Sequence, residues 1–405
     1  MNYSAEEIMQ YIEEEDVKFI RLAFCDIYGN QKNISVMPSE LERVFSTGIG
    51  FNASAIPGFD SEIHSDLFLH PDPATLSVLP WRPEHGRVVR MFCNITYPNG
   101  KPFPYDTRNI LKTAIAEAKD KSLTFAFGSE MEFYLFKTDE NGNPTKEPYD
   151  NAGYMDIAPE DKGENVRREI CLTLEQMGIR PESSHHKYGP GQNEINFRYA
   201  DPLKAADDAI TFRAVVKTIA ARYGLYADFS PKPLNQASGN GMHINVSVKN
   251  GKSNDCMPYA IAGILDKIGE MTLFLNPTKQ SYERLGSNKA PGYISWSSQN
   301  RSQLIRIPAA EGEYRRAELR SPDPAANPYL AYTLIIYAAI HGIENGLPLP
   351  APADLNLSEA GPGDLSSYKR LPYNLDQAVM AAKTSSFISE HLPENLISSY
   401  CNRLV

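Results

Sequence analysis

The stretch Glu130-Met131-Glu132-Phe133-Tyr134-Leu135 carries the pattern that decides how the larger part of the chain folds. Successive side chains of a β-strand point to opposite faces of a sheet. The two glutamates therefore share one face, and the three apolar residues Met131, Phe133 and Leu135 share the other. This alternation predicts a strand that packs one face against a core and presents two carboxylates on the opposite face.

Three further stretches repeat the alternation: Glu194-Ile195-Asn196-Phe197, Met242-His243-Ile244-Asn245-Val246-Ser247-Val248 and Arg316-Ala317-Glu318-Leu319-Arg320. If the four polar faces converge, they form a site for a hard divalent cation. Carboxylate oxygens with one imidazole suit Mg²⁺ or Mn²⁺ better than Zn²⁺ or copper. The predicted metal ligands are Glu130, Glu132, Glu194, His243 and Glu318.

Arginines stand close to these carboxylates in the sequence. Arg316 and Arg320 bracket Glu318, and Arg301 and Arg306 flank an apolar stretch that we expect to be another strand. A guanidinium holds phosphate or carboxylate oxygens through two parallel hydrogen bonds. Divalent cations and arginines in one cleft meet the requirements of phosphoryl transfer, in which charge on the transferring oxygens must be neutralised. One such strand alone is more often a solvated sheet face, and the recurrence in four strands favours a site.

A short run of small residues, Ser238-Gly239-Asn240-Gly241, directly precedes the strand of His243. Small residues let a ligand approach the backbone closely, although such a run is usually only a turn. The chain contains neither a GxxxxGK[ST] loop nor a GxGxxG loop. Nucleotide binding of the P-loop and dinucleotide types is therefore excluded.

Composition limits the possible partners and compartment. The 405 residues include 50 acidic and 40 basic ones, with a formal net charge of -10, so nothing favours nucleic acid or an anionic membrane as a partner. The five cysteines stand far apart without a CxxC pair, which indicates reduced thiols. The acidic N-terminus is unlike a signal peptide, and the longest apolar stretch, Tyr329 to Ile343, is shorter than the roughly 20 residues of a membrane span. We expect a cytoplasmic protein.

The pattern along the chain predicts two domains of the α+β class, 1–102 and 103–405, separated by the turn-rich stretch from Pro98 to Pro104. Short strand-like runs precede this stretch, and longer helical patterns mixed with strands follow it. The predicted strands before it include Phe19–Phe24, Ile34–Met37 and Val88–Ile95. The predicted helices after it are Arg108–Lys121, Glu164–Met177, Pro202–Tyr223 and Pro328–Glu344.

At the residues quoted above, the sequence resembles glutamine synthetase of the bacterial type I class over nearly the whole chain. The ATP-site signature of that family is similar to the segment from Lys232-Pro233-Leu234 through Gly241-Met242-His243 to Ser247. Other matching stretches are Phe19-Ile20-Arg21-Leu22, Gly153-Tyr154-Met155-Asp156, Gly191-Gln192-Asn193-Glu194, Asn276-Pro277-Thr278, Asn300-Arg301-Ser302 and the segment from Ser321 to Tyr329. The resemblance implies a small N-terminal β-grasp-like domain and a catalytic domain with a curved antiparallel sheet and surrounding helices.

The resemblance also implies a role for each matching position. Glu132 and Glu194 would hold one metal, and Glu130, His243 and Glu318 would hold the second. The residues implied to bind ATP are Arg301, Arg306, Arg316, Asn245 and Ser247. Those implied to bind glutamate are Arg284, Arg320, Gly239 and Ser238, the last standing where the family has an asparagine. Asp66 would reach the ammonium site of a neighbouring subunit in a homo-oligomeric ring with active sites between subunits.

Two lysines depart from the family pattern at positions that carry chemistry. Lys187 stands where the resemblance implies a metal-binding glutamate, and Lys289 stands where it implies the ammonium-binding glutamate of a flexible flap. A lysine at 187 should weaken the cation site, and Lys289 should repel NH₄⁺. Alternatively, an ammonium takes the place of a metal, or burial neutralises a lysine so that it serves as a base, or both lysines point into solvent.

The resemblance implies an ATP-dependent carboxylate-amine ligase that uses Mg²⁺ or Mn²⁺. It would convert glutamate and ammonia to glutamine through γ-glutamyl phosphate, with no nucleic-acid or membrane partner. Two alternatives stay open because the lysines lie on the amine side of the pocket. The chain either uses another amine or a related acid, or it is a non-catalytic regulatory or scaffold relative.

Overall fold

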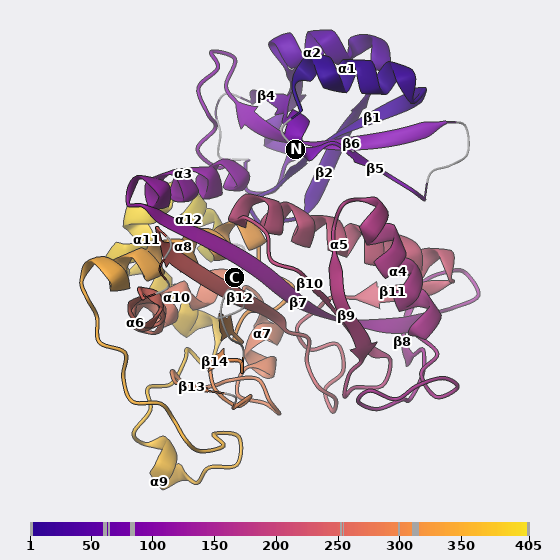
Figure 1. Ribbon diagram of the computed structural model, residues 1–405. Helices are drawn as coiled ribbons and strands as arrows, with labels where there is room; N and C mark the ends of the chain where they lie inside the picture. Colours follow the sequence, from indigo (N-terminus) through magenta and orange to yellow (C-terminus); the bar gives the residue numbers. More distant parts are fainter. Residues whose placement is uncertain are drawn as a thin grey trace.

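The computed structural model describes residues 3–59, 63, 65–81, 86–251, 253, 255–298, 300–309 and 316–402. Figure 1 shows a smaller N-terminal domain, coloured indigo to purple, above a larger catalytic domain. Both domains contain a sheet and helices, so the expected α+β class and the β-grasp-like N-terminal domain are confirmed. Among the described residues, no helix combines the length and the apolar character needed to cross a membrane.

The N-terminal sheet has the strand order β2-β1-β6-β4-β3, and β5 pairs with β6. Strands β1 and β6 run parallel, and the other pairs are antiparallel. The strands are β1 (Val17–Cys25), β2 (Gln31–Val36), β3 (Ile49–Asn52), β4 (Asp66–Pro71), β5 (Ser77–Val78) and β6 (Arg87–Thr96). Helices α1 (Ala5–Glu14) and α2 (Leu41–Thr47) lie over this sheet, and three 3-10 turns are η1 (Pro38–Glu40), η2 (Ala53–Ala55) and η3 (Pro73–Thr75).

The catalytic domain is built on a second sheet with the order β13-β14-β15-β12-β7-β10-β9, in which β8 and β11 also pair with β7. All these pairs are antiparallel except β13 with β14. The strands are β7 (Leu123–Thr138), β8 (Pro144–Pro148), β9 (Pro181–His186), β10 (Gln192–Phe197), β11 (Leu225–Asp228), β12 (Met242–Asn250), β13 (Trp296–Ser298), β14 (Ile305–Ile307) and β15 (Ala317–Leu319). The long strand β7 crosses the domain in Figure 1 and touches four neighbouring strands.

The helices of this domain are α3 (Thr107–Asp120), α4 (Glu164–Gln176), α5 (Pro202–Arg222), α6 (Met257–Leu275), α7 (Lys279–Arg284), α8 (Pro328–Glu344), α9 (Pro362–Leu365), α10 (Leu375–Lys383), α11 (Ser386–His391) and α12 (Glu394–Asn402). They pack around the sheet, except α9, which lies in a loop that projects away from it and has no buried residue (Figure 1). The apolar stretch from Tyr329 to Ile343 belongs to α8, whose residues are nearly all buried. Its apolar character therefore serves the protein core.

Helices α6 and α8 approach each other closely because glycines face one another at their crossing. A Cβ atom on Gly263 would lie 2.1 Å from the carbonyl oxygen of Ala338, and one on Gly342 would lie 2.1 Å from that of Tyr259. Neither position can hold a larger side chain without moving a helix.

Local signals explain why the predicted helices begin where they do. Asp201 caps α5 by accepting a hydrogen bond from the backbone N–H of Lys204, and Pro202 occupies the first turn. Asn327 caps α8 in the same way, followed by Pro328. A proline at the first helical position loses no hydrogen bond, and a capping side chain satisfies a free N–H group. The observed starts of both helices match the expected ones.

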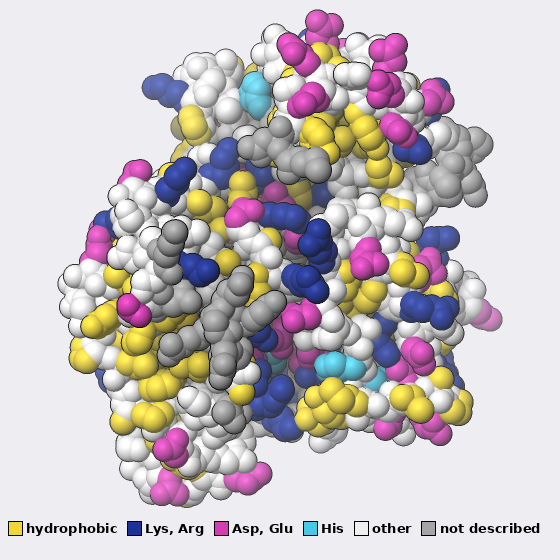
Figure 2. Space-filling view, in the orientation of Figure 1, with side chains coloured by type: hydrophobic (Ala, Val, Ile, Leu, Met, Phe, Trp, Pro, Cys, Tyr) yellow, Lys and Arg dark blue, Asp and Glu magenta, His cyan; other side chains and the backbone are white. Residues whose placement is uncertain are grey.

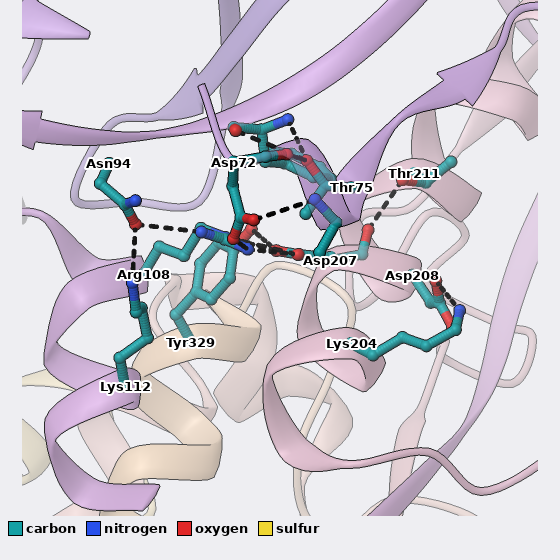
Figure 3. A network of polar contacts seen from close by, with 12 residues as sticks. Asp72, Thr75, Asn94, Arg108, Lys112, Lys204, Asp207, Asp208, Thr211 and Tyr329 are labelled. Carbon is teal, nitrogen blue, oxygen red and sulfur yellow. Dashed lines mark hydrogen bonds and ion pairs between the residues drawn. The ribbon is translucent and has the colours of Figure 1, made fainter. Parts of the chain in front are cut away.

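A buried polar network joins the two domains (Figure 3). Arg108 of α3 donates hydrogen bonds to Asp207 of α5, to Asp72 after β4 and to Asn94 of β6, at 2.9–3.3 Å. Its side chain is 4% exposed. Tyr329 of α8 donates to the same Asp207 carboxylate at 2.6 Å. One guanidinium therefore links the N-terminal sheet to the helices behind the catalytic sheet.

Candidate active site

The register of the catalytic sheet brings the predicted polar faces together. His243 of β12 lies directly opposite Glu130 of β7, and Glu194 of β10 lies opposite Glu132 of β7. Glu318 of β15 lies opposite Asn245, two residues from His243. Directly opposed side chains in an antiparallel pair stand about 4.5–5.5 Å apart at Cβ, and diagonal neighbours remain within reach of long side chains. Strand pairing thus gathers all five predicted ligands on one sheet face.

Three of these five residues form a compact cluster. One ligand atom each from Glu130, His243 and Glu318 lies within 4.8 Å of the others. His243 Nδ1 is 3.6 Å from Glu130 Oε2 and 3.4 Å from Glu318 Oε1. Burial, together with the nearby Arg320 guanidinium, lowers the pKa of His243 to about 4. The imidazole is therefore neutral near pH 7, the form that binds metal, and the cluster fits one hard divalent cation.

Polar neighbours hold the cluster in place. Glu318 is fully buried and forms ion pairs with Arg306 of β14 and with Arg320, whose Nε lies 3.0 Å from Glu318 Oε1. Asn245 donates to Glu130 Oε1 at 2.9 Å. Arg306 was expected to flank its strand, but it lies inside β14, because its backbone pairs with that of Glu318. That pairing directs its guanidinium to the Glu318 carboxylate.

The other two predicted ligands do not face an open cation position. Lys187 Nζ lies 2.9 Å from Glu132 Oε1 and 2.7 Å from Glu194 Oε2. Burial by itself would lower the pKa of Lys187, but the two carboxylates outweigh burial and hold this pKa above its usual value. The lysine therefore stays charged, which contradicts both the expected neutral base and the expected exposure to solvent at this position. The residues present do not fit a divalent cation between Glu132 and Glu194.

A cavity of about 540 Å³ opens beside these clusters. Figure 2 shows basic, acidic and histidine side chains gathered around a hollow, over the region where Figure 1 places β9, β14 and α7. The predicted site residues that line the cavity are Glu132, Lys187, Ser238, Gly239, His243, Arg284, Lys289, Arg301 and Arg320. Candidate site residues from six separate segments therefore meet at one cavity.

The small-residue run before β12 packs tightly against the cavity wall. A Cβ atom on Gly239 would lie 2.4 Å from the carbonyl oxygen of Pro231 and 2.9 Å from Arg284 Cγ. A Cβ atom on Gly241 would lie 2.6 Å from His243 Nε2. Arg284 itself is buried and donates to the carbonyl oxygen of Ser321 at 2.7 Å. Glycine is required here because the backbone passes directly over the imidazole and the guanidinium.

The segment that carries Lys289 lines the cavity. Lys289 Nζ donates to the Tyr188 hydroxyl at 2.6 Å, and its carbonyl oxygen accepts from Arg320 at 3.2 Å. The Tyr188 ring stacks on Tyr154, with ring centroids 4.5 Å apart. A hydrogen bond to the Tyr188 hydroxyl thus holds the Lys289 side chain at the edge of the cavity.

Several lining residues had no predicted role: Tyr154, Tyr188, Gln192, Asn300, Asn356 and Glu359. Gln192 donates to the carbonyl oxygen of Gly239 at 3.0 Å and so fixes the glycine run. Its place beside Glu194 in a matching stretch was the one sequence signal that pointed to it. Asn356 and Glu359 come from the loop before α9, where no strand or helix period indicated a site.

Some predicted residues lie away from the cavity. Asp66 is exposed at the start of β4 in the N-terminal domain, and Ser247 lies farther along β12, opposite Ala126. Arg316 Cζ stands 5.6 Å from the ring of Tyr199, and its Nε has no hydrogen-bond partner among the described residues. Asp66, Ser247 and Arg316 are therefore not among the described residues that line the cavity.

Beside Lys187, a second histidine pairs with a buried aspartate. His186 Nε2 lies 2.9 Å from Asp150 Oδ1, and both groups are buried. Burial by itself would lower the pKa of His186, but the hydrogen bond with Asp150 raises it overall. Burial would likewise raise the pKa of Asp150, but hydrogen bonds from His186 and from the backbone N–H of Gly191 lower it overall.

The pair should stabilise the fold most where both groups are charged. The raised pKa of His186 gives stability that is fully present below about pH 6.5 and is lost as the pH rises through the folded-state pKa. The lowered pKa of Asp150 gives stability that is lost on acidification, as the pH falls through its folded-state pKa. Between about pH 6 and pH 9 the melting temperature should therefore fall more in the native protein than in Asp150→Asn. Equal slopes for the two proteins in thermal unfolding would contradict the pairing.

Family models and relatives agree with this geometry. A model described as the β-grasp domain of glutamine synthetase matches residues 16–98, and one described as the catalytic domain matches residues 104–403. A glutamine synthetase from Methanosarcina mazei is 44% identical over 411 residues, which cover 98% of this chain and 92% of that protein. One from Clostridium saccharobutylicum is 42% identical over 414 residues, covering 98% and 93%.

Solved structures share the fold. A structure titled as a complex of GmaS with ADP superposes with a TM-score of 0.88 at 29% identity and covers 100% of this chain and 95% of that one. The glutamine synthetase of Plasmodium falciparum superposes with a TM-score of 0.87 at 23% identity, again over 100% and 95% of the two chains. At that identity, the second likeness concerns the fold alone.

Proposed function

Because the chain belongs to the glutamine synthetase family, we propose that it is an ATP-dependent ligase that forms glutamine from glutamate and ammonia. The observation that carries the proposal is the cavity lined by His243, the imidazole of the Glu130–His243–Glu318 cluster, together with Arg284, Arg301 and Arg320. Relatives at 42–44% identity over nearly the whole chain favour this reaction. They do not favour the alternatives of another amine, another acid or a non-catalytic scaffold.

The reaction has two steps that the cavity residues can serve. ATP first phosphorylates the side-chain carboxylate of glutamate, and ammonia then displaces phosphate from the resulting γ-glutamyl phosphate. Arg301 lines the cavity, where its guanidinium would stabilise charge on phosphoryl oxygens. Arg284, Arg320, Gly239 and Ser238 also line the cavity and are assigned to glutamate. Support for these roles comes from the cavity lining and from the family motifs.

The Glu130–His243–Glu318 cluster would hold the divalent cation, Mg²⁺ or Mn²⁺. When bound, the ion would neutralise charge on the phosphoryl oxygens as a Lewis acid. Asn245 orients Glu130, and Arg306 and Arg320 orient Glu318. We assign Arg316 and Ser247 to the nucleotide side by family resemblance, beyond the lining of the cavity.

The position of Asp66 supports a ring in which neighbouring chains complete each site. It is exposed on the N-terminal domain and is absent from the described lining of its own chain's cavity. We propose that it reaches the cavity of a neighbouring copy of this chain in a homo-oligomeric ring. The small-molecule substrates and the family membership are consistent with a cytoplasmic enzyme.

The test measures phosphate and glutamine together. Purified protein is incubated with ATP, glutamate and Mg²⁺ or Mn²⁺, with and without ammonium. We expect one glutamine for each phosphate, with both products depending on ammonium. Phosphate release with glutamate alone and no glutamine would point to another amine, and no release under either condition would point to a non-catalytic relative.

A further inference from the structure

The feature that the family reaction does not explain is the ammonium group of Lys187 between Glu132 and Glu194. Its distances of 2.9 and 2.7 Å are those of charge-assisted hydrogen bonds. The Lys187 side chain is 11% exposed, and the two carboxylates are 7% and 5% exposed. Three charged groups are therefore gathered in one largely dry position, where an ammonium is stable only when paired.

Both sides of this contact are fixed by the surrounding backbone. The Lys187 N–H donates to the carbonyl oxygen of Gln192 at 2.7 Å, which anchors the lysine beside β10. Glu132 Oε2 accepts from the backbone N–H of Gly241 at 2.7 Å, and His185 Nε2 lies 3.5 Å from Glu194 Oε1. The remaining oxygens of the two carboxylates thus have polar neighbours. Lys187 and its two carboxylate partners are therefore held in a fixed arrangement in the protein interior.

Charge arithmetic shows what the ammonium replaces. Two carboxylates and one ammonium sum to one negative charge. A third carboxylate in place of the lysine, together with one divalent cation, would give the same sum. Lys187 therefore supplies Glu132 and Glu194 with the neutralisation that a glutamate and a metal ion would supply together. A second cation cannot enter without displacing Nζ, because both would need the same oxygens and like charges repel.

We propose that Lys187 Nζ takes the place of a divalent cation between Glu132 and Glu194. The chain then holds a metal ion at the Glu130–His243–Glu318 cluster and an ammonium at the neighbouring position. This inference rests on the proposed function, since it concerns the same cavity. In that reaction Lys187 is a positioning residue, because it fixes Glu132, which lines the cavity, together with its neighbour Glu194.

The decisive experiment counts metal ions. Full-length protein without nucleotide is dialysed against Mn²⁺, and bound manganese per chain is measured by atomic emission. Lys187→Glu should bind one more Mn²⁺ per chain than the native protein, because it joins a third carboxylate to Glu132 and Glu194. A Lys119→Glu control makes the same charge change on the exposed face of α3 and should bind as many ions as the native protein. Equal numbers for the native protein and Lys187→Glu would overturn the proposal.

A second variant keeps the proposal testable if Lys187→Glu does not fold. Lys187→Ala leaves two buried carboxylates without their cation, and an added metal ion can then replace it. Its melting temperature in a chelator should be lower than that of the native protein. Added Mn²⁺ should raise it by a larger shift than in the native protein. Equal Mn²⁺ shifts would count against the replacement.

Glutamine formation by the native protein separates this inference from the proposed function. Glutamine synthesis with equal ion counts in the native protein and Lys187→Glu would retain the function and remove the lysine proposal. No glutamine synthesis, with the extra ion in Lys187→Glu, would retain the lysine as a metal substitute and remove the function.

Discussion

Glu318→Gln is expected to lower the rate of glutamine formation by about 100-fold or more. Loss of a residue that only supports a metal ligand typically costs 10- to 100-fold in metal affinity or activity, so loss of a direct ligand should reach at least the upper end of that range. The substitution keeps the size of the side chain and removes one negative charge. The measurement is kcat and KM for ATP, with bound Mn²⁺ counted in parallel.

The activity loss is expected because Glu318 interacts with several positively charged groups. This fully buried carboxylate forms ion pairs with Arg306 and Arg320, and it lies 3.4 Å from His243 Nδ1. An amide in its place supplies one oxygen and a nitrogen that cannot accept. Both arginines would lose their charged partner, and the cation site would lose a ligand. We expect metal affinity and catalytic rate to fall together.

Glu182→Gln on β9 is the matched control, because Glu182 belongs to the same sheet and is exposed. It should leave the rate and the metal count unchanged. If Glu318→Gln lost activity but bound as much Mn²⁺ as the native protein, Glu318 would act through its arginines alone. The metal assignment of this cluster would then be wrong.

Which polar side chains share a face of each strand could be predicted, because that follows from strand periodicity, whereas the meeting of the four faces depends on the pairing of the strands. Glu130 and Glu132 share a face in any β-strand, and the same holds for His243 and Asn245. Helix starts could be predicted with similar accuracy, because caps such as Asp201 and Asn327 act within one turn. Both signals are local, so they survive without knowledge of the tertiary structure.

The position of Lys187 could not be decided from sequence. The residue follows β9 immediately, and its direction depends on the pairing of its N–H with Gln192 and on the carboxylates of two other strands. The sequence left open a weakened cation site, a lysine in place of the metal, a neutral base and a solvated lysine. Tyr154 and Tyr188 illustrate the same limit, because their ring stack joins separate loops with no shared period.

The polar network between the domains could not be predicted from the sequence either. Arg108 and Asp207 are 99 positions apart, and neither belongs to a motif of the cavity. A charged residue at a helix start is usually solvated, so its burial follows only from the way that the N-terminal sheet docks on α3 and α5. Long-range partners of this kind require the structure.

Arg108→Ala is expected to lower the free energy of unfolding by about 3–5 kcal/mol, the range for breaking a buried ion pair. The loss has a clear origin, because Asp207 and Asp72 would remain near the domain interface without the guanidinium that they share (Figure 3). For a cooperative unit of this length, a loss of about 1 kcal/mol lowers the melting temperature by about 1 °C, so a fall of about 3–5 °C is expected. Chemical denaturation gives the free energy directly.

The control compares this buried ion pair with one at the protein surface. Arg222→Ala removes an arginine that pairs with Glu169 at the surface, where both side chains are partly exposed, and it should cost about 1 kcal/mol or less. Arg108→Ala combined with Asp207→Ala should cost less than the sum of the two single changes, because the unpaired charge is then removed as well. If Arg108→Ala were as mild as Arg222→Ala, the apolar contacts between the domains would carry the interface without the network. The guanidinium would then select how the N-terminal sheet is oriented on the catalytic domain and would contribute little to holding it there.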